Sequence, residues 1–455
     1  MASDPAPPVP DDLLPARRDL AVRAAIEEGI VSEREPVAAL LDVHAIRYAA
    51  AELRAAFAEV TAPGTPVLHA FAVKAASLVP VLRLLHAEGL GAEVASPGEL
   101  ALAHAAGVPP SRTVLDSPAK TRAELREALA LGIAVNADNR EELARLDALV
   151  ASARTHSPLG LRVNPQLGAG AIDAMSTATA TSKFGVALRD EGAREWVVRA
   201  YQDRPWLNRL HAHTGSQGIP MDLQVAGVRA VYQLAEEINE AVGRRQIDTI
   251  DIGGGLTVNF SSDEMTPTFH DYARLLREKI PGLFDGRYGL VTEFGRSVLA
   301  KAGVVLARVE YAKSSGGRPI AITHAGAQVA TRTVFAPESW PLRVAAYDEK
   351  GRPKEDPYVV QDVAGPCCFA GDLVARERRM PLLAAGDWVG LLDTGAYYAS
   401  TPFGYNSLPR PGIYGFRADA EAGEVQFSMV RDPQTIEQVV AESGANRRDS
   451  LTGLR

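Results

Sequence analysis

The alternation of short apolar runs with helical stretches between about Val37 and Val304 most constrains the fold of this 455-residue chain. Most of the runs are followed by a stretch rich in Ala, Leu, Glu and Arg, which is the rhythm of repeated βα units around a parallel sheet. The runs that read as strands are PVLHAFAV, GAEVAS, RTVLD, IAVNAD, LGLRVNP, LNRLHAHTG, TIDIGGG and GLVTEFG. Eight such units predict a (β/α)₈ barrel in the α/β class.

A second region follows the predicted barrel. After about Ala302, alternating runs such as GVVLARVEYA and PIAITHAG are separated by the turns GGRP and EKGRP, which predicts a mostly β domain. The length also exceeds the usual size of one hydrophobic core. We therefore predict an N-terminal tail and a segment joining the β domain in 1–36, a barrel in 37–304, and a β domain completing the active site in 305–455. The first dozen residues, rich in proline and acid, are expected to be a mobile tail.

Composition narrows the class of partner. The formal net charge is −8 and no long run has a single sign, which argues against a nucleic-acid or anionic-membrane partner and favours a small molecule. No stretch approaches about 20 apolar residues, and MASDPAPPVPDD is unlike a signal peptide. The only cysteines, Cys367 and Cys368, are adjacent, an arrangement that suits free thiols in a reducing compartment. We expect a cytoplasmic protein without a metal site.

Polar residues fall at the predicted carboxyl ends of the barrel strands, where barrel enzymes place their chemistry. These residues are Lys74, Glu93, Asp116, Asn164, His213, Gly253 to Gly255 and Glu293. Lys74 ends an otherwise apolar run, and burial there would lower the pKa of its amine and favour imine formation with an aldehyde. Taken alone, the pattern favours an ion-paired or snorkelling lysine over a Schiff base.

Three further motifs have both a chemical and a structural interpretation. DIGGGL presents three glycines whose backbone N–H groups can approach an anion, or it is a tight strand-to-helix turn. HAHTGSQ offers His213 and Ser216, although His213 can also be structural. EFGRS places Glu293 three residues before Arg296: the carboxylate suits a pyridine nitrogen and the guanidinium a phosphate or carboxylate, or the two form a surface ion pair.

Two motifs lie in the predicted β domain. GPCCFAGD carries both thiols and Asp372, and a buried cysteine is usually a small apolar filler. YYASTPFGYNSLPRP supplies Tyr397, Tyr398 and Tyr405 in a loop broken by prolines, where tyrosines are more often packing residues than ligands. Neither motif identifies a function by itself.

Taken together and in this order, the motifs resemble the fold type III pyridoxal-phosphate (PLP) decarboxylases, the group of diaminopimelate, ornithine and biosynthetic arginine decarboxylases. The resemblance extends from about Val37 to Pro411 and includes AEVASPGEL with Glu93 and Glu99, RVNP at 162–165, and TSKFGV around Lys183. It implies a PLP-dependent enzyme that decarboxylates an amino acid.

The resemblance also implies roles for individual residues. Lys74 would hold PLP as a Schiff base, His213 would stack on its ring, and Glu293 would bind the pyridinium nitrogen. Cys368 would protonate the carbon that loses carbon dioxide. Cys368 and Asp372 come from the second subunit in this family, which implies a homodimer. The remaining implied cofactor contacts are Glu93, Ser216, Gly253, Gly254, Gly255, Gly295, Arg296 and Tyr405, and the implied substrate contacts are Arg296, Arg332, Phe369, Asp372 and Tyr405.

One departure from the family pattern bears on the substrate. Diamine-forming members carry an acidic residue after the cysteine, whereas this chain has Phe369, which cannot pair with a distal ammonium. HAGAQVATRTVF resembles the diaminopimelate enzymes' segment that carries an arginine for the distal carboxylate, and Arg332 falls at that arginine, while Ala336 stands near the place of the family's tyrosine. We expect a substrate with a distal carboxylate or modified side chain.

Two alternatives remain open at the level of sequence. One is a PLP-dependent racemase or epimerase on a related barrel. Such an enzyme is expected to place an arginine at the pyridine nitrogen, whereas this chain has Glu293. A non-catalytic PLP-binding protein would lack the β domain with its Cys368 motif, or would have lost the lysine or the phosphate loop.

Overall fold

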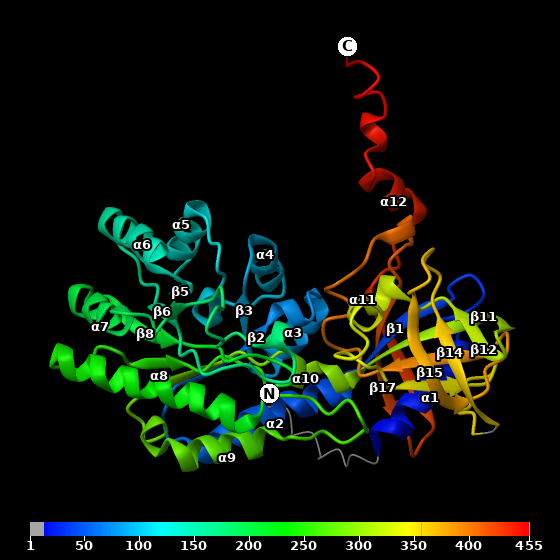
Figure 1. Cartoon of the computed structure of the whole chain (residues 1–455), viewed down its shortest axis with the longest axis horizontal. Helices are drawn as coiled ribbons and strands as arrows, with labels where there is room; N and C mark the ends of the chain where they lie inside the picture. Colours follow the sequence, from blue (N-terminus) through cyan, green and yellow to red (C-terminus); the bar gives the residue numbers. More distant parts are fainter. Residues whose placement is uncertain (1–12, 356, 455) are drawn as a thin grey trace. The chain divides into compact units, whose positions relative to one another are not determined.

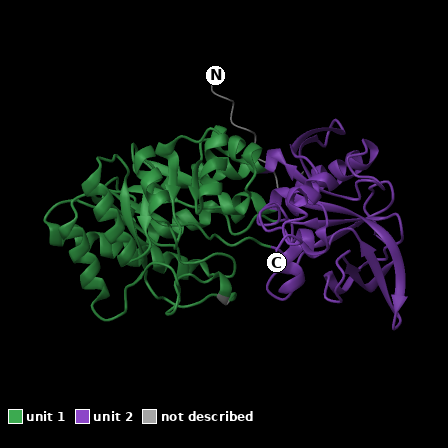
Figure 2. Cartoon of the chain, turned by 90° about the horizontal axis from the view of Figure 1, so that it is seen from above, with its two compact units in different colours: residues 1–7, 46–259, 264–300 green, residues 8–45, 260–263, 301–455 purple. Residues whose placement is uncertain are grey.

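The computed structural model describes residues 13–355 and 357–454, so the predicted tail in 1–12 lies outside the described residues. These residues form two compact units (Figure 2). The first contains 46–259 and 264–300, and the second contains the described residues up to 45, then 260–263 and those from 301 onward. No helix in the described ranges combines the length and the apolar character that a bilayer span requires.

The first unit is the predicted barrel. Its strands are β2 (Val67–Ala72), β3 (Gly91–Val94), β4 (Thr113–Leu115), β5 (Ala134–Ala137), β6 (Leu159–Asn164), β8 (Leu207–His211), β9 (Thr249–Asp251) and β10 (Gly289–Thr292). They pair in parallel in the order β5-β4-β3-β2-β10-β9-β8-β6, and a β5–β6 pairing closes the ring. The short strand β7 (Val186–Ala187) adds to β6. The predicted eight-stranded parallel barrel is therefore confirmed.

Helices lie outside these strands (Figure 1). They are α2 (Val43–Val60), α3 (Val79–Ala87), α4 (Pro97–Ala105), α5 (Arg122–Leu131), α6 (Arg140–Ser152), α7 (Ala193–Asp203), α8 (Met221–Val242), α9 (Phe269–Lys279) and the short α10 (Arg296–Leu299). Every residue of β3, β4, β5 and β6 is buried, as expected for parallel strands covered on both faces. A local signal marks the start of α5, where Thr121 and Glu124 form a reciprocal capping box.

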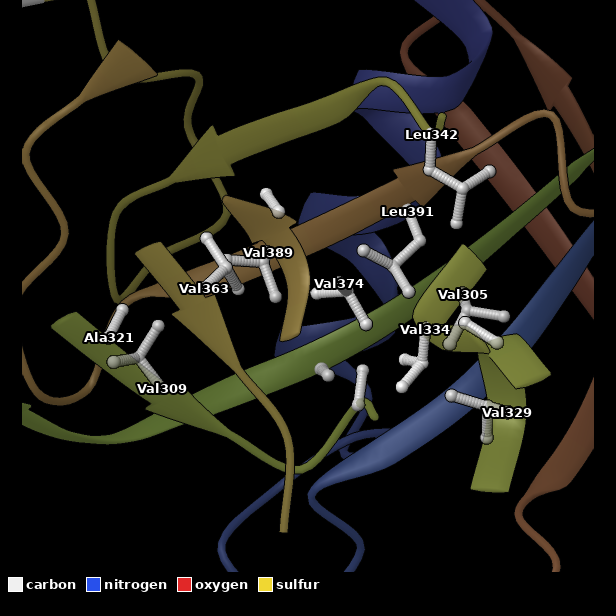
Figure 3. Packing of buried hydrophobic residues seen from close by; sticks show 14 of the residues in the cluster. Val305, Val309, Ala321, Val329, Val334, Leu342, Val363, Val374, Val389 and Leu391 are labelled. Atoms are coloured by element: carbon white, nitrogen blue, oxygen red, sulfur yellow. The ribbon is translucent and has the colours of Figure 1, made fainter. Parts of the chain in front are cut away.

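The second unit is the predicted mostly β domain. Its sheet has the order β15-β14-β12-β11-β1-β17-β18, with β16 joining β11 to β13. The strands are β1 (Val37–Asp42), β11 (Gly303–Ser315), β12 (Arg318–Thr323), β13 (Val344–Tyr347), β14 (Tyr358–Ala364), β15 (Leu373–Pro381), β16 (Trp388–Leu392), β17 (Gly412–Asp419) and β18 (Glu424–Arg431). Its helices include α1 (Leu13–Glu27), α11 (Ala327–Phe335) and α12 (Ile436–Glu442). Figure 3 shows part of the core, in which Val305, Val329 and Leu391 pack between α11 and the strands.

The N-terminal boundary of the barrel differs from the expected Val37. Strand β1 pairs antiparallel with β11 and parallel with β17, so Leu40 lies between Val304 and Tyr414 in the second unit. The helix α2 then leads into the barrel. The composition of an apolar run such as VAALLD is compatible with a strand in either sheet. Only its pairing with distant strands decides to which unit it belongs.

Candidate active site

Lys74 lies directly after β2, in the one-turn 3₁₀ helix Val73–Ala75. Its Nζ lies 2.5 Å from Oε2 of Glu93 on β3. The carboxylate is buried, but 45% of the lysine side chain is exposed. The expectation of a buried lysine was therefore wrong, because the chain leaves the strand before Lys74 and turns the side chain toward solvent. Glu93 thus holds an accessible primary amine at the carboxyl end of the barrel.

A buried group of titratable side chains lies at the carboxyl ends of β4, β8, β9 and β10. His211 ends β8, with Nδ1 3.4 Å from Oδ1 of Asp116 and Nε2 3.5 Å from Oε2 of Glu293. Asp251 ends β9, and ligand atoms of all four residues lie within 4.8 Å of one another. Among the described residues, Oε1 of Glu293 has no hydrogen-bond partner. The group concentrates acidic side chains where burial separates them from bulk solvent.

Burial and the neighbouring charges together shift the pKa of these carboxyl groups in different directions. Burial and the charges of Asp116 and Glu93 raise the pKa of Glu293 well above its usual value. Burial and then the charge of Glu293 raise the pKa of Asp251 to about 8. Burial also opposes ionisation of Asp116, but the neighbouring His211 outweighs it and lowers the pKa of Asp116 well below its usual value. A cationic or N–H-donating group at Glu293 would offset this repulsion.

The glycine segment after β9 is held by side chains of the same unit. The N–H of Gly253 donates to Oδ1 of Asp251 at 3.1 Å, and the N–H of Gly254 donates to Nδ1 of His213 at 3.0 Å. A Cβ on Gly255 would lie 1.8 Å from the carbonyl oxygen of Gly215, so only glycine fits there. Two of the three backbone donors are thus already engaged. Only the amide of Gly255 has no such bond among the described residues.

His213 follows β8 and is partly buried. Burial and the nearby charges of Arg162 and Lys74 lower its pKa well below the usual value. Its Nδ1 accepts the Gly254 N–H, so the ring is neutral and its proton is on Nε2. This fixes both the tautomer and the position of the ring edge.

The other predicted barrel residues lie on the loops around this group. The backbone N–H of Ser216 donates to the carbonyl of Met175 at 3.0 Å. Gly295 precedes α10, and a Cβ there would lie 2.9 Å from Cβ of Ala75, beside the Lys74 turn. Arg296 is the first residue of α10 and is buried. The barrel therefore brings its predicted residues to the carboxyl ends of its strands.

The two cysteines of the second unit have different environments. Cys367 is buried, its Sγ lies 3.8 Å from Oε1 of Gln328, and burial and the charge of Asp372 raise the pKa of its thiol to about 11. Cys368 is exposed, and its backbone N–H donates to Oδ1 of Asn406 at 2.7 Å. Only Cys368 therefore presents its thiol to an external molecule.

Asp372 is buried, and both oxygens of its carboxylate accept hydrogen bonds from backbone N–H groups. Oδ1 accepts the N–H of Ala327 at 2.6 Å, and Oδ2 accepts the N–H of Cys367 at 2.7 Å. A Cβ on Gly326 or Gly365 would lie within 2.4 Å of its oxygens, so the backbone closes around the carboxylate. Asp372 consequently fixes the turn that carries the thiols.

Arg332, Phe369 and Tyr405 lie in aromatic surroundings of the second unit. The guanidinium carbon of Arg332 is 4.8 Å from the ring centre of Tyr397 and 5.1 Å from that of Trp340. Nη1 of Arg332 is buried, with no hydrogen-bond partner among the described residues. The Phe369 ring packs 5.8 Å from that of Tyr405, whose hydroxyl donates to the carbonyl of Cys368 at 3.3 Å.

Comparison with known proteins decides the family. Residues 46–300 match the family model described as pyridoxal-dependent decarboxylase, pyridoxal binding domain. A diaminopimelate decarboxylase of Pseudomonas aeruginosa is 33% identical over 388 residues, covering 85% of this chain and 88% of that protein. One from Methanothermobacter thermautotrophicus is 32% identical over 81% of this chain and 83% of that protein.

The chain belongs to the pyridoxal-dependent decarboxylases. The M. jannaschii diaminopimelate decarboxylase in complex with L-lysine has the same fold, with a TM-score of 0.80 at 23% identity over 93% of this chain and 94% of that chain. The expected activity and cofactor are confirmed at the level of the family: the protein is a PLP-dependent amino-acid decarboxylase, a carboxy-lyase.

The residues of the barrel fit PLP. Lys74 offers an accessible amine, and the unsatisfied Oε1 of Glu293 suits a protonated ring nitrogen, which would also relieve the repulsion that raises the Glu293 pKa. The Gly255 amide lies in a segment where a side chain would not fit, which leaves backbone close to an anion. The decarboxylase site therefore matches the aldehyde, the ring nitrogen and the phosphate of the cofactor.

Some of the residues that surround the predicted ones in each unit were missed from sequence. His211 and Asp251 are the last residues of β8 and β9, a position that is itself a signal in a barrel. Asn406, which holds the Cys368 amide, has no recognisable signal, since its contact spans 38 residues.

Proposed function

We propose that this decarboxylase acts on an α-amino acid whose distal end is a carboxylate or a modified group, not a free ammonium. The observation that carries the proposal is Asp372. It is the only acidic residue in the GPCCFAGD turn, and both of its oxygens accept backbone N–H groups. Phe369, the neighbour of Cys368, offers no charge. A distal ammonium at this turn would lose its hydration without gaining a partner.

Arg332 supports a carboxylate or similar anion as the distal group. Its guanidinium is held between the rings of Tyr397 and Trp340, and Nη1 is buried with no acceptor in the described part of the chain. A carboxylate is the planar acceptor that a guanidinium binds best. The proposal thus assigns Arg332 to the substrate's far end.

The barrel residues would hold PLP and orient the substrate. We assign the covalent link to Lys74, the ring nitrogen to Glu293, one ring face to His213, and the phosphate to Gly255, Ser216 and the Gly295–Arg296 segment. When bound, PLP supplies a protonated ring that accepts the electrons of the breaking Cα–carboxylate bond. Glu293 keeps that ring protonated, and neutral His213 adds no positive charge to compete with it.

Cys368 would complete the reaction. Carbon dioxide leaves Cα, and the Sγ–H of Cys368 delivers the proton that takes its place. A donor must come within about 3 Å of Cα to do so. Cys368 is exposed, whereas Cys367 is buried with a raised pKa, which favours Cys368 as the donor.

The assembly is also part of the proposal. As in the family that the motifs resemble, we propose a homodimer in which Cys368 of one subunit serves the Lys74 site of the other.

A panel of substrates tests the proposed specificity. The acylated compounds Nε-acetyl-lysine and Nε-succinyl-lysine differ in a distal carboxylate, and 2-aminopimelate is diaminopimelate without its far amine. We expect kcat/KM for Nε-succinyl-lysine and 2-aminopimelate to exceed that for lysine and ornithine. Arg332→Met should lower kcat/KM for the succinyl compound by about 10- to 150-fold while changing the acetyl compound much less. Efficient turnover of lysine or ornithine would refute the proposal.

Diaminopimelate is the second candidate, because the relatives carry that name. Its distal carboxylate suits Arg332, but its distal ammonium would lack an acid at Phe369. The ratio of kcat/KM for 2-aminopimelate to that for diaminopimelate separates the two candidates.

A further inference from the structure

Four aromatic rings form one cluster beside Cys368 in the second unit. Phe335 ends α11, Phe369 follows Cys368, and Phe403 and Tyr405 belong to the loop before β17. Phe335 and Phe369 stack at 5.6 Å with an interplanar angle of 7°, and Phe403 and Tyr405 stack at 5.8 Å and 22°. The two pairs meet edge to face, Phe335 with Phe403 at 5.1 Å and Phe369 with Tyr405 at 5.8 Å.

The rings are only partly used by the hydrophobic core. Phe369 and Phe403 pack against the cluster of buried residues that contains Val305 and Val329. Phe335 and Tyr405 are 56% and 42% exposed. Contiguous exposed apolar surface of this kind marks a place where another group binds.

Two residues of the loop that carries Phe403 and Tyr405 form hydrogen bonds with the backbone of Cys368. The hydroxyl of Tyr405 donates to the Cys368 carbonyl at 3.3 Å, and the Cys368 N–H donates to Oδ1 of Asn406 at 2.7 Å. Phe369 is the next residue in the chain. The loop that carries the rings is therefore bonded to the backbone of Cys368, the residue that we assign as proton donor.

The loop that supplies two of the rings is strained. Asn406 and Ser407 have φ values of 58° and 52°, the left-handed region that residues with a side chain rarely adopt, and they do so consecutively. Such strain persists where the surrounding contacts impose it, and it concentrates at binding and catalytic sites. Here the strained residues are those that direct Tyr405 and Asn406 to Cys368.

We propose that Phe335, Phe369, Phe403 and Tyr405 form a subsite for a flat aryl ring on the distal part of the substrate's side chain. This inference rests on the proposed function, since it describes what takes the place of a distal ammonium.

The ring geometry favours a flat group over a cation. A cation site would turn several ring faces toward one point. Here the faces of each pair cover each other, and ring edges, which are electropositive, meet the neighbouring pair. Phe335 and Tyr405, the exposed rings of the cluster, remain available for offset stacking with another ring.

The test uses three amines that differ only in their distal group. They are 1,5-diaminopentane, its N-benzoyl derivative and its N-cyclohexanecarbonyl derivative, and calorimetry measures their dissociation constants from the PLP-loaded enzyme. The benzoyl and cyclohexanecarbonyl groups have similar size, but only the first is flat. We expect the benzoyl amine to bind about 2- to 12-fold more tightly than the cyclohexane analogue, and the free diamine to bind weakest.

Variants assign the effect to the rings. Phe335→Leu and Phe369→Leu should bring the benzoyl-to-cyclohexane ratio toward one. Phe427→Leu is the matched control, because Phe427 is a partly buried ring of the same unit that packs with Phe416 outside the cluster. The control should leave the ratio unchanged.

The outcomes separate this inference from the proposed function. If the free diamine binds as tightly as both acylated amines, the proposed function fails. If both acylated amines bind better than the diamine but equally well, and Phe335→Leu has no effect on their ratio, the ring subsite fails while the proposed function stands. A Phe335→Leu enzyme that dissociates into monomers in sedimentation with the ratio unchanged would show that the rings pack subunits together, and would also overturn the inference.

Discussion

Replacing Phe369 by glutamate should give this enzyme activity toward substrates with a distal ammonium. Phe369 is partly buried beside the exposed Cys368, and the nearest acid in the turn, Asp372, is committed to two backbone N–H groups. A carboxylate at position 369 would supply the missing charge. Phe369→Gln is the matched control, because it also removes the ring but adds no charge.

The expected changes in kcat/KM and in stability follow from the new charged hydrogen bond and from the lost ring contacts. A hydrogen bond between charged groups contributes about 1.5–3 kcal/mol, which corresponds to a roughly 10- to 150-fold higher kcat/KM for lysine in Phe369→Glu than in Phe369→Gln. Both variants lose the ring contacts with Phe335 and Tyr405, each worth about 0.5–1.5 kcal/mol, so both should unfold at a lower temperature than the native enzyme.

The assay is carbon dioxide release from lysine, ornithine and diaminopimelate by PLP-loaded enzyme. Differential scanning calorimetry verifies that both variants fold. If folded, PLP-loaded Phe369→Glu shows no gain over Phe369→Gln on any of the three, the distal end of the substrate does not reach position 369.

Four further predictions concern the remaining residues. Lys74→Ala should abolish turnover and the visible absorbance of bound cofactor, since it removes the amine that Glu93 holds; an unchanged spectrum would contradict the assignment. Cys368→Ala should slow product formation by about 100-fold or more, with Cys367→Ala much less affected, because only Cys368 is exposed; equal losses accompanied by unfolding would favour a packing role for both. An equal mixture of inactive Lys74→Ala and Cys368→Ala subunits should recover at most roughly a quarter of native activity, since half the dimers are mixed and each has one intact site; no recovery despite demonstrated exchange would show that each chain builds its own site. Burial and the charge of Glu293 raise the pKa of Asp251 in the fold to about 8, whereas the unfolded chain loses this proton near pH ~4. The free energy of unfolding of the cofactor-free form therefore falls as pH rises from about 4 to 8. Asp251→Asn should raise the Tm of that form by at least about 3 °C at pH 8.5 and have little effect near pH 4.5.

The barrel and its reacting end were determined by the sequence alone. Parallel strands covered on both faces read as short apolar runs, and the polar residue after each run lies at the carboxyl end of a strand. That placed Lys74, Glu93 and Glu293 on one rim before any pairing was known. The order of the motifs indicated the family, and membership of the family implied the cofactor PLP.

Pairing and burial were decided only by the tertiary structure. The run 37–42 satisfies a barrel strand locally, yet it pairs with β11 and β17, because strand partners are chosen by contacts far along the chain. Lys74 was expected to be buried and is not, because the strand ends at Ala72 and the chain turns into the 3₁₀ helix Val73–Ala75, a turn that the surrounding apolar residues do not mark.

The residues that we propose for the substrate's distal end show the same division between sequence and structure. The sequence identified Phe369 as a departure, because one residue beside a motif can be compared directly. It could not show that Asp372 is occupied by the amides of Ala327 and Cys367, or that Phe335 reaches Phe369 across 34 residues. Whether a carboxylate is available to a ligand depends on which donors the fold brings to it, and those donors are brought together only when the chain closes on itself.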